Sequence, residues 1–389
     1  MRAAFATTLI SSLVATINAS PAPVVHRDTN DFYVQNIAAC PALAPRVTTT
    51  KSVHDARPDD FTVFMALGDS ITAGALAEGL QTNPFNILKE WRGVSYAIGG
   101  DPGAITVPNL MSHYSNTRPK GASVGSHGLQ ICFGPLCLPG SLGWNSKVDQ
   151  FSAALTGALA SNLLHEAKDY LVPQYKASGV SDSALKYMSF QIGSNDVCQL
   201  CALGGIGDGI ANGFEKDVRA TLEHVRKNIP NVLVNIAGVF QVSQIYPLTQ
   251  GKAWCNKILP AIPHVNLECS CALLGGAAGN VTRSLMDDLA DQYNTRLQKI
   301  VKEYQQMKYP GFAAVWQPID LPLTTFPVEA LSDVDCFHPS TMTHQRMAMA
   351  IYSRLTLPQT EREKSFVWQD TPTVRCLEDT DRIDTTSLL

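Results

Sequence analysis

Ser70 belongs to the stretch Gly68-Asp69-Ser70, which follows an apolar run that ends at Leu67. A serine hydroxyl becomes a nucleophile when a neighbouring base takes its proton, so Ser70 could form an acyl-enzyme with an ester. The same three residue types also favour ordinary turns, and the stretch alone does not decide between the two interpretations. The base and the groups that stabilise the developing charge must be found elsewhere in the chain.

His338 is the candidate for that base. It lies in the stretch Asp335-Cys-Phe-His338-Pro339, where the aspartate can reach the imidazole within one turn. Such a contact fixes the tautomer and stabilises the imidazolium, as the aspartate of a Ser-His-Asp triad does. Pro339 favours an extended conformation for His338, which would make the pair rigid. An aspartate that caps a turn beside a solvated histidine is the alternative interpretation.

Asn195 and Gly157 are candidate donors to an oxyanion. Asn195 follows Gly193 at the end of an apolar run, where its amide could donate to a developing negative charge. Gly157 precedes an amphipathic segment around Leu163 and could donate its N–H. An ordinary Asn-Asp turn and an ordinary loop glycine are the alternatives.

The elements that must position these residues alternate between apolar runs and helical patterns. Three segments repeat apolar residues at helical spacing, beginning at Phe214, Leu285 and Met347. Four runs are apolar along their length rather than alternating, as strands buried on both faces are, at residues 63–67, 187–192, 232–239 and 313–316. The alternation predicts an α/β fold whose parallel sheet carries helices on both faces. Ligands of such sheets bind beyond the carboxyl ends of the strands, where Ser70 lies.

These motifs occur in the order that is typical of the SGNH, or GDSL-type, hydrolases, which the sequence resembles from about Ser52 to Pro358. The phospholipase B branch is the most similar, and the stretches that carry this similarity are Ser52–Asp60, Tyr96–Asp101, Asn195–Cys201 and Asp335–His338. The resemblance implies a three-layer α/β/α fold with a parallel, flavodoxin-like sheet. It also implies ester hydrolysis without a metal or another cofactor.

The resemblance further implies a role for each matching residue. Ser70 would be the nucleophile, His338 the base and Asp335 its orienting acid. The N–H groups of Ser70 and Gly157 and the side chain of Asn195 would form the oxyanion hole.

The sequence departs from the family pattern at two positions. Ile71 stands where the GDSL name has leucine, which is a mild change. Ser152 stands where the second motif usually has asparagine, so the assignment of Gly157 is less secure. Gly99 and Gly100 are the rival oxyanion donors.

Charge and motifs exclude several classes of partner. The chain has 389 residues and a formal net charge of −4. This charge gives no indication of a basic surface that would bind nucleic acid. The glycine-rich run 204–209 lacks the spacing of a dinucleotide fingerprint. His264 lies near Cys269 and Cys271, but oxidised cysteines fit a secreted chain better than a zinc site does. We expect a monomer with no metal and no cofactor.

The sequence predicts four consecutive segments in the chain. Residues 1–19 have a charged start, a short apolar run and a small residue before the expected cleavage site, which is the pattern of a signal peptide; a buried helix is the alternative. We expect residues 20–50 to form an irregular extension that Cys40 could tie down. Residues 51–376 would form the hydrolase domain and residues 377–389 a polar tail. The protein is therefore expected to be secreted.

Ten cysteines on such a chain predict disulfides. Two local bonds are expected, Cys132 with Cys137 and Cys198 with Cys201. Cys269 and Cys271 are too close in sequence to bridge easily, so each should have a distant partner. Asn280 begins a glycosylation sequon that follows a glycine-rich stretch expected to be a loop.

The sequence thus predicts a secreted serine ester hydrolase that acts on glycerophospholipids or related acyl glycerols through an acyl-enzyme on Ser70. An acetyl esterase that acts on polysaccharide is an alternative on the same fold, and an inactive secreted binding protein is another. The apolar segment 129–144 could line an acyl groove or touch a membrane surface transiently. In that case its residues Ile131, Phe133, Leu136, Leu138 and Trp144 would meet the lipid. Burial of the segment against its own domain is the alternative.

Overall fold

The computed structural model describes residues 25–26, 32–44, 50, 52–80, 88–115, 117–137, 143–200, 208–256 and 269–389. The expected signal peptide at residues 1–19 lies outside these ranges, as do Leu138, Cys201 and His264.

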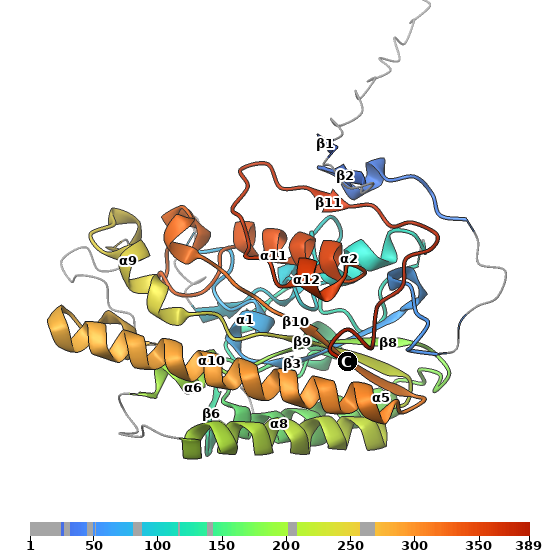
Figure 1. The fold of residues 1–389 in the computed structure, drawn as a ribbon, viewed down its shortest axis with the longest axis horizontal. Coiled ribbons are helices and arrows are strands. Elements are labelled where there is room, and N and C mark those ends of the chain that lie inside the picture. Colours follow the sequence, from blue (N-terminus) through green and yellow to red (C-terminus); the bar gives the residue numbers. More distant parts are fainter. Residues whose placement is uncertain are drawn as a thin grey trace, which may run out of the picture.

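A four-stranded parallel sheet forms the centre of the molecule (Figure 1). Its strand order is β10–β9–β8–β3, and every residue of the four strands is buried. The strands are β3 (Val63–Gly68), β8 (Lys186–Gln191), β9 (Val232–Ala237) and β10 (Phe312–Gln317). All four predicted strands are confirmed, and the predicted ends differ by one or two residues.

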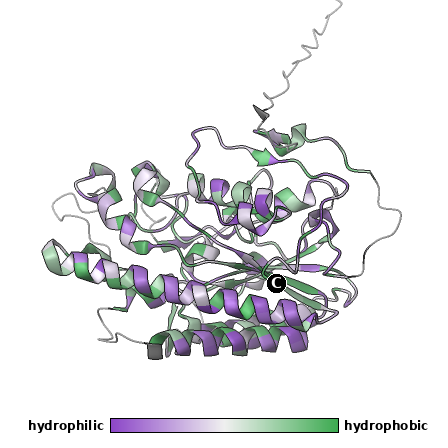
Figure 2. Ribbon diagram, in the orientation of Figure 1, coloured by the Kyte–Doolittle hydropathy of each residue, from purple (hydrophilic) through white to green (hydrophobic). Residues whose placement is uncertain are grey.

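Helices cover both faces of the sheet and complete a three-layer α/β/α fold. Figure 1 shows α8 and α10 on one face and α2 and α11 on the other. The predicted helical stripes are confirmed, because Val218, Leu222 and Leu297 are fully buried. Figure 2 shows hydrophobic residues along the central strands and hydrophilic residues on the outer faces of the helices. The bounds of these helices are α2 (Val107–Ser112), α8 (Asp208–Asn228), α10 (Gly276–Met307) and α11 (Thr341–Arg354).

Shorter elements connect these layers. The short helices are α1 (Ser70–Ala73), α3 (Ser146–Asp149), α4 (Leu163–His165), α5 (Val172–Ala177), α6 (Ser194–Cys198), α9 (Ile245–Thr249) and α12 (Gln359–Arg362). A π-helical stretch, Glu166–Leu171, joins α4 to α5. Two antiparallel pairs form from β4 (Lys89–Glu90) with β5 (His127–Gly128), and from β6 (Cys132–Phe133) with β7 (Leu136–Cys137). None of the helices in the described part of the chain has the length and apolar character needed to cross a membrane.

Irregular backbone pairs with the outer edge of β3. The N–H of Phe64 donates to the carbonyl of Lys120, and the N–H of Ala66 donates to that of Phe151. The N–H of Leu155 donates to the carbonyl of Gly68 at 3.1 Å. The segment that approaches Gly157 is therefore fixed to the strand that delivers Ser70.

The N-terminal extension meets the C-terminal segment in a small antiparallel sheet. Its strands are β1 (Val25–His26), β2 (Phe32–Val34) and β11 (Val374–Arg375). A disulfide joins Cys40 to Cys376, so Cys40 does tie the extension down. Residues 20–50 were expected to be irregular, but part of this region forms strands because β11 supplies a partner distant in sequence.

Two local expectations are wrong. Cys198 forms a disulfide with Cys269, so the predicted Cys198–Cys201 bond does not exist, although Cys132–Cys137 does. The glycine-rich stretch before the sequon is not a loop, because α10 already begins at Gly276. Asn280 is exposed in the first turns of that helix.

Candidate active site

Ser70 is the first residue of α1, directly beyond the end of β3. Gly68 ends the strand with a φ of 154°, and a Cβ on it would lie 2.3 Å from the carbonyl oxygen of Gln191. Asp69 then caps α1 by accepting a hydrogen bond from the N–H of Ile71 at 2.9 Å. This sharp change from strand to helix presents Ser70 at a helix N-terminus, where backbone N–H groups lack intrahelical partners. The Ser70 side chain is buried.

His338 and Asp335 form the predicted pair. The Nδ1 of His338 lies 2.5 Å from the Oδ2 of Asp335, while Asp335 Oδ1 accepts from the N–H groups of Phe337 and His338. Burial alone would raise the pKa of Asp335, but the charge and hydrogen bond of His338 and these backbone donors hold the pKa below its usual value. Asp335 is therefore a carboxylate at neutral pH and can orient the imidazole.

Hydrogen bonds attach the loop of His338 to the chain that follows Ser70. The Oγ of Ser332 donates to the carbonyl of Leu76 at 2.8 Å, and the N–H of Thr341 donates to that of Ala77 at 2.7 Å. The N–H of Ser332 donates in turn to the carbonyl of His338 at 2.8 Å. Leu76 and Ala77 stand just beyond α1, so the structure holds the His338 loop against the element that carries Ser70.

Asp69, the residue before Ser70, has a shifted pKa. Burial raises the pKa of Asp69 to about 6, although the hydrogen bond from Ile71 and the charge of His338 lower it. A disulfide between Cys255 and Cys336 also fixes the His338 loop.

Asn195 and Gly157 come together at the carboxyl end of β8. Gly193 has a φ of 122°, which favours glycine and allows the turn into α6. The Nδ2 of Asn195 donates to the carbonyl of Ala158 at 3.0 Å, and Asp196 accepts from the N–H of Ala160. An amide nitrogen has two hydrogens, so one bond to Ala158 leaves Asn195 a further donor. Gly157 has a φ of 81°, which again favours glycine.

The rival oxyanion donors are already occupied. The N–H of Gly99 donates to the carbonyl of Ser95 at 2.9 Å, and the N–H of Gly100 donates to that of Ser123 at 2.7 Å. These bonds favour Gly157 as the second glycine of the site.

Three carboxyl groups, those of Asp69, Asp196 and Glu166, lie next to residues of this site. Burial raises the pKa of Asp196 to about 7 and raises the pKa of Glu166 well above its usual value. Glu166 Oε2 accepts from the N–H of Gly68 at 2.9 Å. Burial thus favours the neutral form of these two carboxyl groups, as it does for Asp69. Sequence reasoning missed Glu166, because nothing in the chain distinguishes it from a surface helix residue.

Ser123 is a rival nucleophile, because Gly121-Ala122-Ser123-Val124-Gly125 has the G-x-S-x-G pattern of many serine hydrolases. Sequence reasoning did not consider Ser123. Its Oγ donates to the main-chain carbonyl of Asp149 at 2.8 Å. The nearby His127 has Nδ1 at 2.6 Å from the Gly128 carbonyl and Nε2 at 2.7 Å from Asp149. Both ring nitrogens are therefore engaged, and His127 cannot take a proton from Ser123.

A possible ligand cluster for a metal ion is oxidised. Cys132, Cys137 and His165 lie close together, but the two cysteines form a disulfide and so offer no thiolate.

The β6–β7 hairpin and the residue before it carry exposed apolar side chains, and that of Phe133 lies beside Gly157. Ile131, Phe133 and Leu136 are 41, 40 and 70% exposed. A Cβ on Gly157 would lie 3.8 Å from the Phe133 ring. Asn162 holds the hairpin by bonds to the N–H and the carbonyl of Gly134.

Trp144 belongs to the fold rather than to this exposed surface. Its ring stacks on Tyr170, and its Nε1 donates to the carbonyl of Ala153 at 3.0 Å. Of the apolar residues expected to meet lipid, Ile131, Phe133 and Leu136 are thus the described ones that reach the surface.

The chain is similar to several known proteins. Residues 64–351 match the model of the GDSL-like lipase/acylhydrolase family. Membrane-associated phospholipase B1 of Homo sapiens is 25% identical over 87% of this chain and 22% of its own length. The corresponding protein of Rattus norvegicus is 26% identical over 82% of this chain and 21% of its own length, so the chain spans about a fifth of these relatives. A crystal structure of phospholipase A1 from Streptomyces albidoflavus aligns with 73% of this chain and 94% of its own at 16% identity, with a TM-score of 0.34.

Proposed function

Because the chain belongs to the GDSL-like lipase/acylhydrolase family and is an ester hydrolase, we propose that it cleaves acyl esters of glycerophospholipids through an acyl-enzyme on Ser70. The observation that carries this proposal is the attachment of the His338–Asp335 loop to the chain just beyond Ser70. A nucleophile, a base and an orienting carboxylate are the parts that acyl transfer needs.

The chemistry follows the order of proton transfers in a serine hydrolase. Ser70 Oγ attacks the ester carbonyl carbon while His338 Nε2 takes its proton. The N–H groups of Ser70 and Gly157 and the amide of Asn195 donate to the oxyanion. His338 then protonates the alcohol oxygen of the leaving lysophospholipid, and a water molecule releases the fatty acid from Ser70 in the second half of the reaction.

Three features support a lipid substrate and a secreted protein. The exposed side chain of Phe133 in the β6–β7 hairpin lies beside Gly157, where an acyl chain would approach. The similarity to proteins named phospholipase B1 agrees with this substrate class. Disulfides such as Cys40–Cys376 are typical of proteins that leave the cytosol.

The test is the change Ser70→Ala, with Ser123→Ala as the matched control for the second serine motif. Fatty-acid release from phosphatidylcholine micelles should fall by at least about a thousandfold in Ser70→Ala, because the acyl-enzyme cannot form. Ser123→Ala should retain most of the activity. Activity of Ser70→Ala within a few-fold of the unmodified protein would refute the proposal. Release of acetate from acetylated xylan without release of fatty acid would refute the lipid substrate and leave the nucleophile in place.

A further inference from the structure

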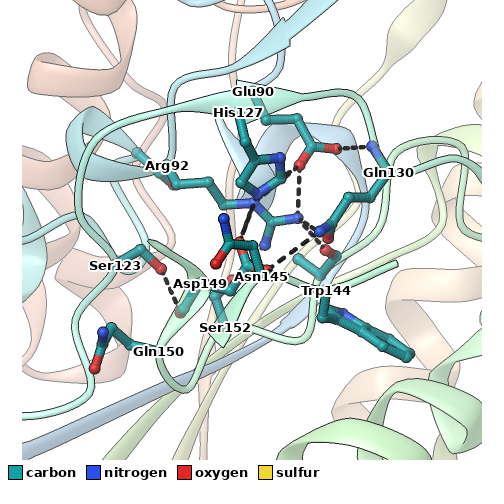
Figure 3. Close-up of polar contacts among 12 residues, drawn as sticks. Glu90, Arg92, Ser123, His127, Gln130, Trp144, Asn145, Asp149, Gln150 and Ser152 are labelled. Atoms are coloured by element: carbon teal, nitrogen blue, oxygen red, sulfur yellow. Dashed lines mark hydrogen bonds and ion pairs between the residues drawn. The ribbon is translucent and has the colours of Figure 1, made fainter. Parts of the chain in front are cut away.

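A buried cluster of charged side chains lies beside the site and takes no part in the chemistry described above. The side chains of Glu90, Arg92 and Asp149 are fully buried. Arg92 Nη2 lies 2.7 Å from Glu90 Oε2, and Arg92 Nε lies 3.2 Å from Asp149 Oδ1 (Figure 3). Burying such charges costs free energy, and apolar side chains would often fill the same space at least as well. The cluster therefore calls for a functional explanation.

The cluster binds the segment that ends at Gly157. Arg92 Nη1 donates to the Oγ of Ser152 at 3.1 Å, and Arg92 Nη2 donates to the carbonyl of Ala154 at 2.8 Å. The hydroxyl of Thr156 donates to Glu90 Oε1. Glu90 and Arg92 thus hold three of the five residues that precede Gly157, including its immediate neighbour.

The same short element is attached to the helix of Ser70. In the chain that includes β4, the carbonyl of Lys89 accepts from the N–H of Leu76 at 2.9 Å, and the N–H of Trp91 donates to the carbonyl of Gly74 at 2.8 Å. Gly74 is the C-terminal cap of α1. Residues 89–92 therefore contact the nucleophile's helix through the backbone and the Gly157 segment through side chains.

We infer that Glu90 and Arg92 are positioning residues that set the distance between the N–H of Gly157 and Ser70. The inference rests on the proposed function, in which Gly157 donates to the oxyanion. Oxyanion donors act mainly in the transition state, and small displacements of such groups reduce turnover strongly. The planar guanidinium of Arg92 suits this task, because it holds several acceptors in a fixed geometry that a lysine cannot reproduce.

Thr156 provides the sharpest test, because its hydroxyl is a link that can be removed without a change in volume. Thr156→Val should lower kcat on a soluble short-chain ester about tenfold, with KM within about twofold, since the lost contact acts on a transition-state donor. Thr156→Ser keeps the hydroxyl and should keep kcat within about twofold of the unmodified protein. Thr221→Val is the matched control, because it removes one buried hydroxyl bond to the Asp217 carbonyl in α8. It should leave kcat unchanged.

Arg92→Lys is the second variant, and it should lower kcat at least as much as Thr156→Val does. If Arg92→Lys does not fold, the comparison of Thr156→Val with Thr156→Ser still tests the inference. Unchanged kcat in Thr156→Val, a loss confined to KM, or an equal loss in Thr156→Ser would overturn the inference. The proposed function has its own test, since an active Ser70→Ala variant would refute it. If Ser70→Ala is inactive and Thr156→Val keeps its kcat, only the positioning role is refuted.

Discussion

His127 has a hydrogen-bond acceptor at each ring nitrogen, the carbonyl of Gly128 at Nδ1 and the carboxylate of Asp149 at Nε2. A neutral imidazole has a single N–H, so only the protonated ring donates to both. Burial alone would lower the pKa of His127, but the bond and charge of Asp149 and the charge of Glu90 hold the pKa above its usual value, against the opposing charge of Arg92. The folded protein therefore binds this proton more tightly than the unfolded chain does.

This difference predicts a pH-dependent contribution to stability. A histidine whose pKa is raised on folding stabilises the protein fully below its unfolded pKa of about 6.5, and the contribution is lost as the pH rises through the folded pKa. His127→Gln should thus reduce the free energy of unfolding more at a pH of about 5.5 than at about 9. Urea unfolding of the two proteins at both pH values measures the difference. An equal loss at both would show that His127 does not carry the charge.

The residues that could be predicted from the sequence are those whose partner stands nearby in the chain. Asp335 and His338 are three residues apart, and Ser70 stands two residues after the end of a strand, so short motifs reveal them. Glu90 and Arg92 act through residues about sixty positions later, and each resembles an ordinary surface residue in the sequence. Only the folded chain brings these pairs together.

The β6–β7 hairpin exposes apolar side chains near the site, including those of Phe133 and Leu136. It is short, and both the Cys132–Cys137 disulfide and the bonds of Asn162 to Gly134 hold its shape. Phe133 and Leu136 therefore remain on the surface, where a lipid aggregate can reach them.

The hairpin predicts a difference between two kinds of substrate. Phe133→Ser together with Leu136→Ser should lower hydrolysis of phosphatidylcholine micelles at least about tenfold, because each apolar side chain that leaves water contributes about 1.5–3 kcal/mol. Hydrolysis of a soluble short-chain ester should change less than about twofold. Met307→Ser together with Val367→Ser is the control, since these side chains are 55 and 76% exposed elsewhere on the molecule. Equal losses on both substrates would give the hairpin a structural role only.

Elements could be predicted where burial alone determines them. Three of the four central strands are apolar at nearly every position, β8 is apolar at about half, and the structure contains all four. The strands of the small sheet have two or three residues each and depend on pairing between β2 and β11, so no local pattern predicts them. The composition of the run Gly275–Gly279 suggests a loop. The glycine at position 279 has a different reason, because a Cβ there would clash with the carbonyl of Leu274 and no larger residue fits in this helix position.

At the scale of the whole molecule, a disulfide and a strand pair join the N-terminal region to the C-terminal region. The Cys40–Cys376 disulfide spans 336 residues, and β2 pairs with β11 beside it. The segment after β11 also packs on the domain, since the N–H of Ile383 donates to the carbonyl of Ala56 and Ile383 is buried.

Removal of this disulfide should lower the stability of the protein and leave its catalytic rate unchanged. Cys40→Ser together with Cys376→Ser should lower the free energy of unfolding by about 2–5 kcal/mol, because the unfolded chain regains the freedom that the bond removes. The kcat on a soluble ester should stay unchanged at a temperature where the variant is folded. Urea unfolding and initial rates measure the two effects. A variant as stable as the original, or one that is stable but inactive, would contradict this expectation.

The outer edge of β3 also affects how copies of the protein meet one another. An open strand edge presents N–H and C=O groups that a strand of a second molecule can join, and aggregates grow by this route. On β3 such groups already bond to Lys120, Phe151 and Ala153 of the same chain. A neighbouring molecule would have to displace this backbone first, so the strand that delivers the nucleophile is protected from adding a foreign strand at high protein concentration.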